Sequence, residues 1–129
     1  MYDVIIVGAG PAGLFSAYEL LENNPKLKVA MLDRGAKADK RTCPMNKNKT
    51  SCANCNPCAI LSGYGGAGTF SDGKLNFIPR LGKSDLFKYM GINEANQLID
   101  DTEEIFNKFN MNSDVYPTNM EEANKIIVK

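Results

Sequence analysis

The stretch that decides the fold runs from residue 3 to residue 13 and reads Asp-Val-Ile-Ile-Val-Gly-Ala-Gly-Pro-Ala-Gly. Its first half is a β-branched run, which is typical of a strand covered on both faces. Its second half has the spacing G-x-G-x-x-G, and Pro11 stands where a helix can begin without needing a backbone N–H. We therefore expect a strand, a tight turn and a helix in immediate succession.

The following residues extend this pattern to a strand–helix–strand unit over residues 1–34. Apolar side chains recur at helical spacing as far as Leu21, and Asn23-Asn24-Pro25 ends the helix. A second short apolar run over residues 28–32 is closed by Asp33, about 20 residues beyond the last glycine of the motif. The whole pattern predicts the dinucleotide-binding βαβ unit of a Rossmann-like α/β fold.

Each part of the glycine motif has a physical task toward a dinucleotide. The first glycine permits the tight turn, the second lets a diphosphate approach the backbone, and the third lets the helix pack close to the strand. The helix start then offers N–H groups and a positive dipole end to the diphosphate. Asp33 is placed to accept hydrogen bonds from ribose hydroxyls, and it would repel a 2′-phosphate. A turn that binds nothing would leave the position of this acid unexplained. The predicted cofactor-binding residues of this unit are Gly8, Gly10, Pro11, Ala12, Gly13, Asp33 and Arg34.

A polar stretch over residues 35–58 contains all four cysteines, in the spacing C-x8-C-x2-C-x2-C. Four thiolates at this spacing suit a zinc ion or an iron–sulfur cluster, and the chain has no histidine that could replace one of them. Redox-active thiols or a disulfide are a second interpretation, and unliganded thiols are a third. The candidate metal ligands are Cys43, Cys52, Cys55 and Cys58.

The segment 63–73 holds five glycines in eleven residues, which permits close backbone approach to a flat or charged ligand. We expect Gly65, Gly66 and Gly68 near the ring system of the bound dinucleotide or near its diphosphate opposite the helix, and a flexible loop is the alternative. Lys74 would place a positive charge near that ring system unless it is only a solvated residue. Asp72-Gly73, flanked by residues 69–71 and 74–77, predicts a β-hairpin.

The C-terminal residues 91–129 have a helical pattern. Apolar residues recur every three or four positions from Ala95 to Phe109, and Asn93 is the expected N-cap. A second short helix is expected from Thr118, where Glu121 would complete a capping box.

The composition excludes some classes of binding partner. Fifteen basic and fifteen acidic residues give zero net charge, so no basic surface is expected to bind nucleic acid. No apolar run reaches the roughly 18 residues of a membrane span, and Asp3 and the glycines do not fit a signal peptide. We expect a cytoplasmic protein whose partners are a small-molecule substrate or an electron donor.

The quoted residues also carry a family resemblance. The start Val-Ile-Ile-Val-Gly-Ala-Gly-Pro-Ala-Gly-Leu resembles the FAD-binding N-terminus of flavoproteins with two dinucleotide-binding domains, and this favours FAD over NAD. Together with Arg41-Thr-Cys-Pro44 and segments 52–58 and 65–75, the chain to about residue 116 resembles the uncharacterised FAD-dependent dehydrogenases of bacteria and archaea, also described as NAD(P)/FAD-dependent oxidoreductases. The resemblance implies FAD as the hydride or electron carrier and NAD(P)H as a donor to the full-length protein, with no substrate specified.

Members of such families are several times longer than this chain. We therefore expect residues 1–129 to be a partial FAD-binding domain, in which a Cys- and Gly-rich insertion (35–77) and a helical segment (78–129) follow the βαβ unit (1–34). It would keep the adenosine-diphosphate half of the site. Two alternatives stay open: a non-catalytic nucleotide- or metal-binding module with a structural four-cysteine site, and a flavin-dependent tRNA-modifying enzyme.

Overall fold

The computed structural model describes residues 1–111, 119 and 121, and the chain divides into two compact units, 1–74 and 75–129. Each unit is described by itself. Unit 1 contains β1 (Val4–Val7), α1 (Pro11–Asn23), β2 (Val29–Leu32), the 3-10 turn η1 (Ala38–Lys40), α2 (Pro44–Asn48) and the 3-10 turn η2 (Gly66–Phe70). Unit 2 contains β3 (Arg80–Leu81), β4 (Ser84–Asp85), the 3-10 turn η3 (Leu86–Lys88) and α3 (Ile92–Lys108).

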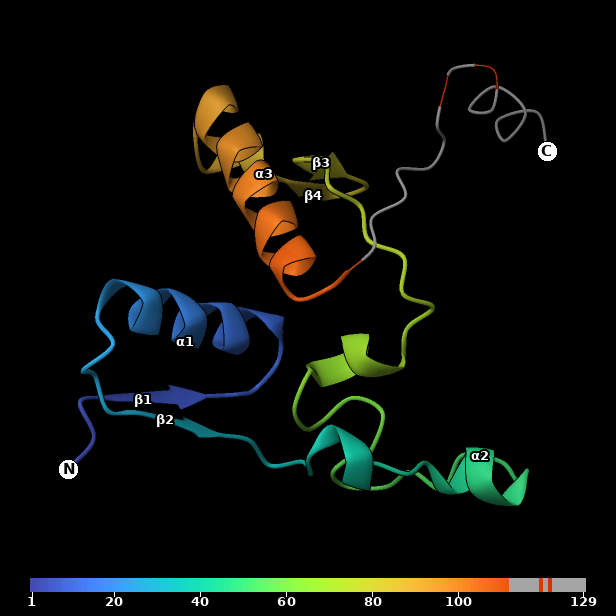
Figure 1. Ribbon diagram of the computed structural model, residues 1–129. Coiled ribbons are helices and arrows are strands. Elements are labelled where there is room, and N and C mark those ends of the chain that lie inside the picture. Colours follow the sequence, from blue (N-terminus) through green and yellow to red (C-terminus); the bar gives the residue numbers. More distant parts are fainter. Residues whose placement is uncertain (112–118, 120, 122–129) are drawn as a thin grey trace. The chain divides into compact units, whose positions relative to one another are not determined.

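The predicted strand–helix–strand unit is confirmed. Strands β1 and β2 pair in parallel, with Val4 opposite Val29 and Val7 opposite Leu32. Helix α1 forms the crossover between them and contacts both strands (Figure 1). A parallel pair joined through a helix is the smallest element of a Rossmann-like α/β fold, and this arrangement fits such a unit.

Gly8 and Gly13 allow α1 to pack closely against β1. Gly8 has a φ of 101°, in the left-handed region that favours glycine, and it turns the chain from β1 toward α1. A Cβ atom on Gly13 would overlap the carbonyl oxygen of Gly8 and would lie 3.3 Å from the Ile6 side chain. The first turn of α1 therefore rests directly on the end of β1, as the motif predicts.

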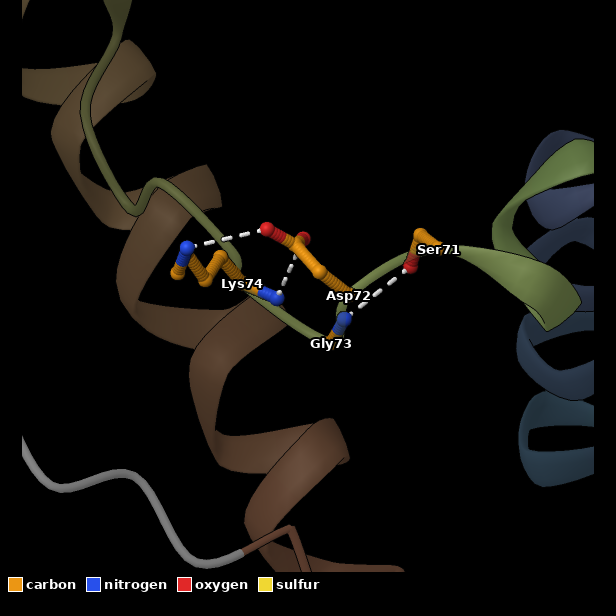
Figure 2. A network of polar contacts seen from close by, with 4 residues as sticks. All are labelled: Ser71, Asp72, Gly73 and Lys74. Atoms are coloured by element: carbon orange, nitrogen blue, oxygen red, sulfur yellow. Dashed lines mark hydrogen bonds and ion pairs between the residues drawn. The ribbon is translucent and has the colours of Figure 1, made fainter.

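The hairpin predicted around Asp72-Gly73 is wrong. Residues 71–74 form a polar turn instead (Figure 2), in which Ser71 Oγ accepts from the Gly73 N–H at 3.2 Å and Asp72 Oδ1 accepts from the Lys74 N–H at 3.3 Å. These side chains bind backbone donors locally, which competes with strand pairing. The short hairpin of the chain is β3–β4, where Gly82-Lys83 forms the turn and Leu81 pairs with Ser84.

Unit 2 packs through the apolar residues of α3. Ala95 of α3 is fully buried, and the Phe106 ring meets the Phe77 ring edge-on with centroids 6.1 Å apart. Helix α3 begins at Ile92 with Gly91 as its N-cap, so the predicted Asn93 cap is wrong. The Gly91 carbonyl already accepts the first helical bond, from the Ala95 N–H, and this places Asn93 inside the helix.

Two further expectations about the C-terminal residues have different outcomes. The apolar stripe of α3 is only partly covered, because Leu98 and Phe109 are exposed. The helix expected from Thr118 falls outside the described residues, of which only Asn119 and Glu121 belong to that stretch. Within the described ranges, no helix is both long enough and apolar enough to span a membrane.

Candidate dinucleotide-binding site

The start of α1 is open to an incoming group. Gly10 is its N-cap and has no side chain to cap the helix, while Pro11 follows at the first helical position. The first N–H groups of a helix have no acceptor inside the helix. A Cβ atom on Gly10 would meet no atom within 4 Å. The turn therefore presents bare backbone and the positive end of a helix dipole, which together suit an anion.

Asp33, directly after β2, joins this turn to the following loop. Its Oδ2 accepts from the Ala9 N–H at 2.8 Å, and its Oδ1 accepts from the Gly35 N–H at 2.8 Å. These two bonds, first that from Ala9 and then that from Gly35, hold the pKa of the Asp33 carboxyl below its ordinary value. The Gly63 N–H and the charge of Arg41 lower this pKa further, so the carboxylate is ionised at neutral pH. A carboxylate has about four acceptor sites, so these backbone donors do not occupy all of them.

The Gly-rich segment lies against the same turn. The Gly65 N–H donates to the Ala9 carbonyl at 2.8 Å, and a Cβ atom on Gly66 would lie 3.2 Å from Gly10 Cα. The fully buried Ala9 thus has its N–H bound by Asp33 and its carbonyl bound by Gly65. Two segments far apart in the sequence meet at the motif, Asp33 from one side and residues 65–66 from another.

Three other predicted cofactor residues lie in different surroundings. Gly68 lies within η2, and a Cβ atom there would meet nothing within 4 Å. Lys74 is exposed and its Nζ lies 3.0 Å from Asp72 Oδ2 (Figure 2). Arg34 is exposed and donates from Nη2 to Asn56 Oδ1, in the cysteine-rich stretch. The contacts of Lys74 and Arg34 are therefore with neighbouring protein groups.

The four cysteines are free thiols, with Cys43 and Cys58 half-buried and Cys52 and Cys55 exposed. In the part of the chain that the structure describes, no three His, Cys, Asp or Glu side chains gather closely enough to hold a metal ion. This arrangement gives no support to the predicted zinc or iron–sulfur site. Helix α2 occupies the chain between the first two cysteines, and Cys52 Sγ instead faces Asn54 Oδ1 at 3.7 Å.

Cys58 differs from a solvated thiol. The N–H groups of Ile60 and then Leu61 lower the pKa of its thiol, and the positive charge of Arg41 lowers it further. These groups stabilise the thiolate. A lowered thiol pKa is the property on which cysteine reactivity depends.

Sequence reasoning missed Arg41 as a site residue. Its side chain is buried, with 6% exposure, and its guanidinium donates to backbone carbonyls of the segment that follows the cysteines. No spacing rule marks such a residue, because its partners are carbonyl oxygens that every residue carries. Only the folded path of residues 59–70 reveals them.

The geometry defines a class of site: a strand–turn–helix with a glycine motif, an acid at the tip of the neighbouring parallel strand and a second backbone segment against the turn. Comparisons with known proteins cover the same part of the chain. The model of the Thi4 family matches residues 1–38. No solved structure matches.

Two curated proteins match a short segment of the chain. The chain is 53% identical over 34 residues to the mitochondrial L-2-hydroxyglutarate dehydrogenase of Dictyostelium discoideum, which is 26% of this chain and 8% of that protein. It is 52% identical over 33 residues to the thiamine thiazole synthase of Phaeosphaeria nodorum, which is 26% of this chain and 10% of that protein. The matched segment is therefore a small part of each relative.

Proposed function

We propose that this chain binds FAD through the turn between β1 and α1 and belongs to a flavin-dependent oxidoreductase. The observation that carries the proposal is the bare backbone at Gly10, at the start of α1, with Asp33 and Gly66 beside it. The FAD diphosphate would lie at the helix start, and Asp33 would also accept from the adenosine ribose. Bound flavin would supply the redox chemistry by carrying a hydride or electrons.

The choice of FAD over NAD rests on the resemblance of the N-terminal motif. The match of residues 1–38 to the Thi4 family and the short matches to a dehydrogenase and to a thiazole synthase support an enzyme of this general kind. The role of this chain's own residues is to bind and orient the cofactor. We further propose that the full-length protein uses a nicotinamide electron donor and acts on a small-molecule substrate.

The test is a titration of the purified 129-residue chain with FAD, ADP and NAD, followed by flavin fluorescence and calorimetry. The decisive variant is Gly10→Ala, because its Cβ enters space that is open in the protein but that a diphosphate would occupy. We expect unchanged unfolding and an FAD affinity weaker by about tenfold or more, which corresponds to roughly 1.4 kcal/mol.

The matched control is Gly91→Ala in unit 2, because Gly91 is likewise a helix N-cap without a side-chain cap bond, and a Cβ there also meets nothing within 4 Å. It should bind FAD like the unchanged chain. A chain that binds neither FAD nor ADP, or a Gly10→Ala variant with undiminished affinity, would overturn the proposal. Tighter binding of NAD than of FAD would overturn the flavin assignment alone. Metal analysis of the same sample tests the alternative of a non-catalytic module with a four-cysteine metal site.

A further inference from the structure

We propose that Arg41 is a positioning residue for the dinucleotide site, and that it acts through one peptide unit, the one between Tyr64 and Gly65. The Arg41 guanidinium binds the carbonyl of this unit, and the N–H of the same unit binds the turn after β1. The expected effect on cofactor affinity rests on the proposed function. The contacts of Arg41 themselves do not depend on it.

Arg41 holds both ends of the segment 59–69. Its Nε donates to the Ala59 carbonyl at 2.8 Å and its Nη2 to the Ile60 carbonyl at 2.5 Å. Its Nη1 donates to the Tyr64 carbonyl at 2.9 Å and to Thr69 Oγ1 at 3.1 Å. A guanidinium is planar and carries its donors in a fixed fork, so these four bonds fix the acceptors relative to one another.

The Tyr64–Gly65 peptide unit transmits this order to the site. A peptide unit is planar, so fixing the direction of its carbonyl also fixes the direction of its N–H. The Tyr64 carbonyl points to Arg41 Nη1 at 2.9 Å, and the Gly65 N–H points to the Ala9 carbonyl at 2.8 Å. Arg41 thereby orients the donor that anchors the Gly-rich segment beside Gly10.

The charge of Arg41 has a second effect on the site. In the described ranges, its guanidinium donates to carbonyl and hydroxyl oxygens, and its carbon lies 4.8 Å from the centre of the Phe70 ring. Its positive charge also helps to lower the pKa of the Asp33 carboxyl, so it offsets part of the negative charge of that carboxylate beside the turn. An anionic diphosphate at the turn would therefore meet less repulsion from Asp33.

The experiment compares Arg41→Met and Arg41→Lys in the full chain, with Arg80→Met as the matched control. Arg80 is a well-exposed arginine of unit 2, with a side chain that is 69% exposed. The first readout is hydrogen exchange of the Gly65 amide, measured against the amides of the β1–β2 pair. The second readout is FAD affinity.

We expect Arg41→Met to lower the protection of the Gly65 amide by roughly tenfold or more while the β1–β2 amides keep theirs, because only the loop loses its fork of donors. FAD affinity should fall by about tenfold. Arg41→Lys should not restore the Gly65 protection, since an ammonium cannot reproduce the planar fork. Arg80→Met should leave both readouts unchanged.

A milder variant, Thr69→Val, covers the case in which Arg41→Met does not fold. It removes the hydroxyl that accepts from Arg41 and donates to the Tyr64 carbonyl at 3.1 Å, without unpairing a whole buried cation. Selective loss of Gly65 protection would again support the inference. Undiminished Gly65 protection, or an equal loss at every amide, would overturn it. Failure of the unchanged chain to bind FAD would overturn the proposed function, while Gly65 exchange still decides whether Arg41 orients the peptide.

Discussion

Residues 1–74 and residues 75–111 are held in shape by different kinds of contact. In the first region, side chains bind backbone groups that are far away in the sequence, as Asp33 binds Ala9 and Arg41 binds Tyr64. In the second region, the side chain-to-backbone hydrogen bonds are local, as in the Asp85 side chain that caps η3 at the Phe87 N–H, and the contact between distant residues is the apolar one of Phe77 with Phe106. Long-range polar contacts assemble a site, whereas local ones build single elements.

This difference predicts where the molecule tolerates change. The site is held by a few side chain-to-backbone bonds and by close approach of backbone segments. If one of these bonds is removed, no other partner replaces it, and the backbone group is left without its hydrogen bond. A region of local elements distributes its stability over many small terms. Substitutions in the first region should therefore have larger effects than those in the second.

The largest effect is expected for Gly13→Ala. The added Cβ overlaps the Gly8 carbonyl oxygen, which is backbone and cannot rotate away, so α1 must shift from β1. We expect the free energy of unfolding to fall by about 1–3 kcal/mol, the range for overpacked sites, and FAD affinity to fall with it. Urea unfolding followed by circular dichroism measures the change.

Gly68→Ala is the control for the free energy of unfolding, because it makes the same substitution where a Cβ finds open space. It should change the free energy of unfolding by no more than about 0.5 kcal/mol. Equal destabilisation by the two variants would show that the contact between α1 and β1 is not the constraint we describe.

A smaller and pH-dependent effect is expected for Asp33→Asn, which replaces one acceptor oxygen by an NH₂ group. The pKa of the Asp33 carboxyl is lowered in the folded state, chiefly by the Ala9 N–H and then by the Gly35 N–H. Its contribution to stability is therefore present above the unfolded pKa of about 3.9 and is lost as the pH falls through the lower folded pKa. The difference in urea midpoint between the unchanged chain and the variant should be constant near neutral pH and shrink below about pH 4.

Asp39→Asn provides the comparison for this pH series, since the Asp39 carboxylate is exposed and lies 4.0 Å from Lys40. Its substitution should leave the midpoint nearly unchanged at every pH. A pH-independent difference for Asp33→Asn would mean that the charge of the carboxylate does not matter for the two backbone bonds.

The sequence predicted the βαβ unit because its signals are local: a β-branched run, a glycine turn and apolar residues at helical spacing. It did not predict that Asp33 binds the backbone of Ala9, because that contact depends on where two loops meet. The role of Arg41 in the site was not predicted for the same reason, because most of its acceptors are backbone carbonyls, which no residue type identifies. The hairpin predicted at Asp72-Gly73 is wrong because the Ser71 and Asp72 side chains accept hydrogen bonds from backbone N–H groups of this turn. Turn propensities alone do not show whether such local bonds or strand pairing will prevail.

The smallest effect is expected in unit 2, at the pair of Arg80 and Asp85, whose charged atoms lie 3.2 Å apart across the β3–β4 register. Arg80→Ala should cost about 0–1 kcal/mol, because the arginine side chain is 69% exposed and water screens the pair. Asp85→Ala should cost more, about 0.5–2 kcal/mol, since it also removes the acceptor for the Phe87 N–H. A double-mutant cycle separates the two contributions. A coupling between Arg80 and Asp85 as large as the loss from Gly13→Ala would erase the distinction between the two regions, because a local surface pair would then matter as much as close backbone packing at the site.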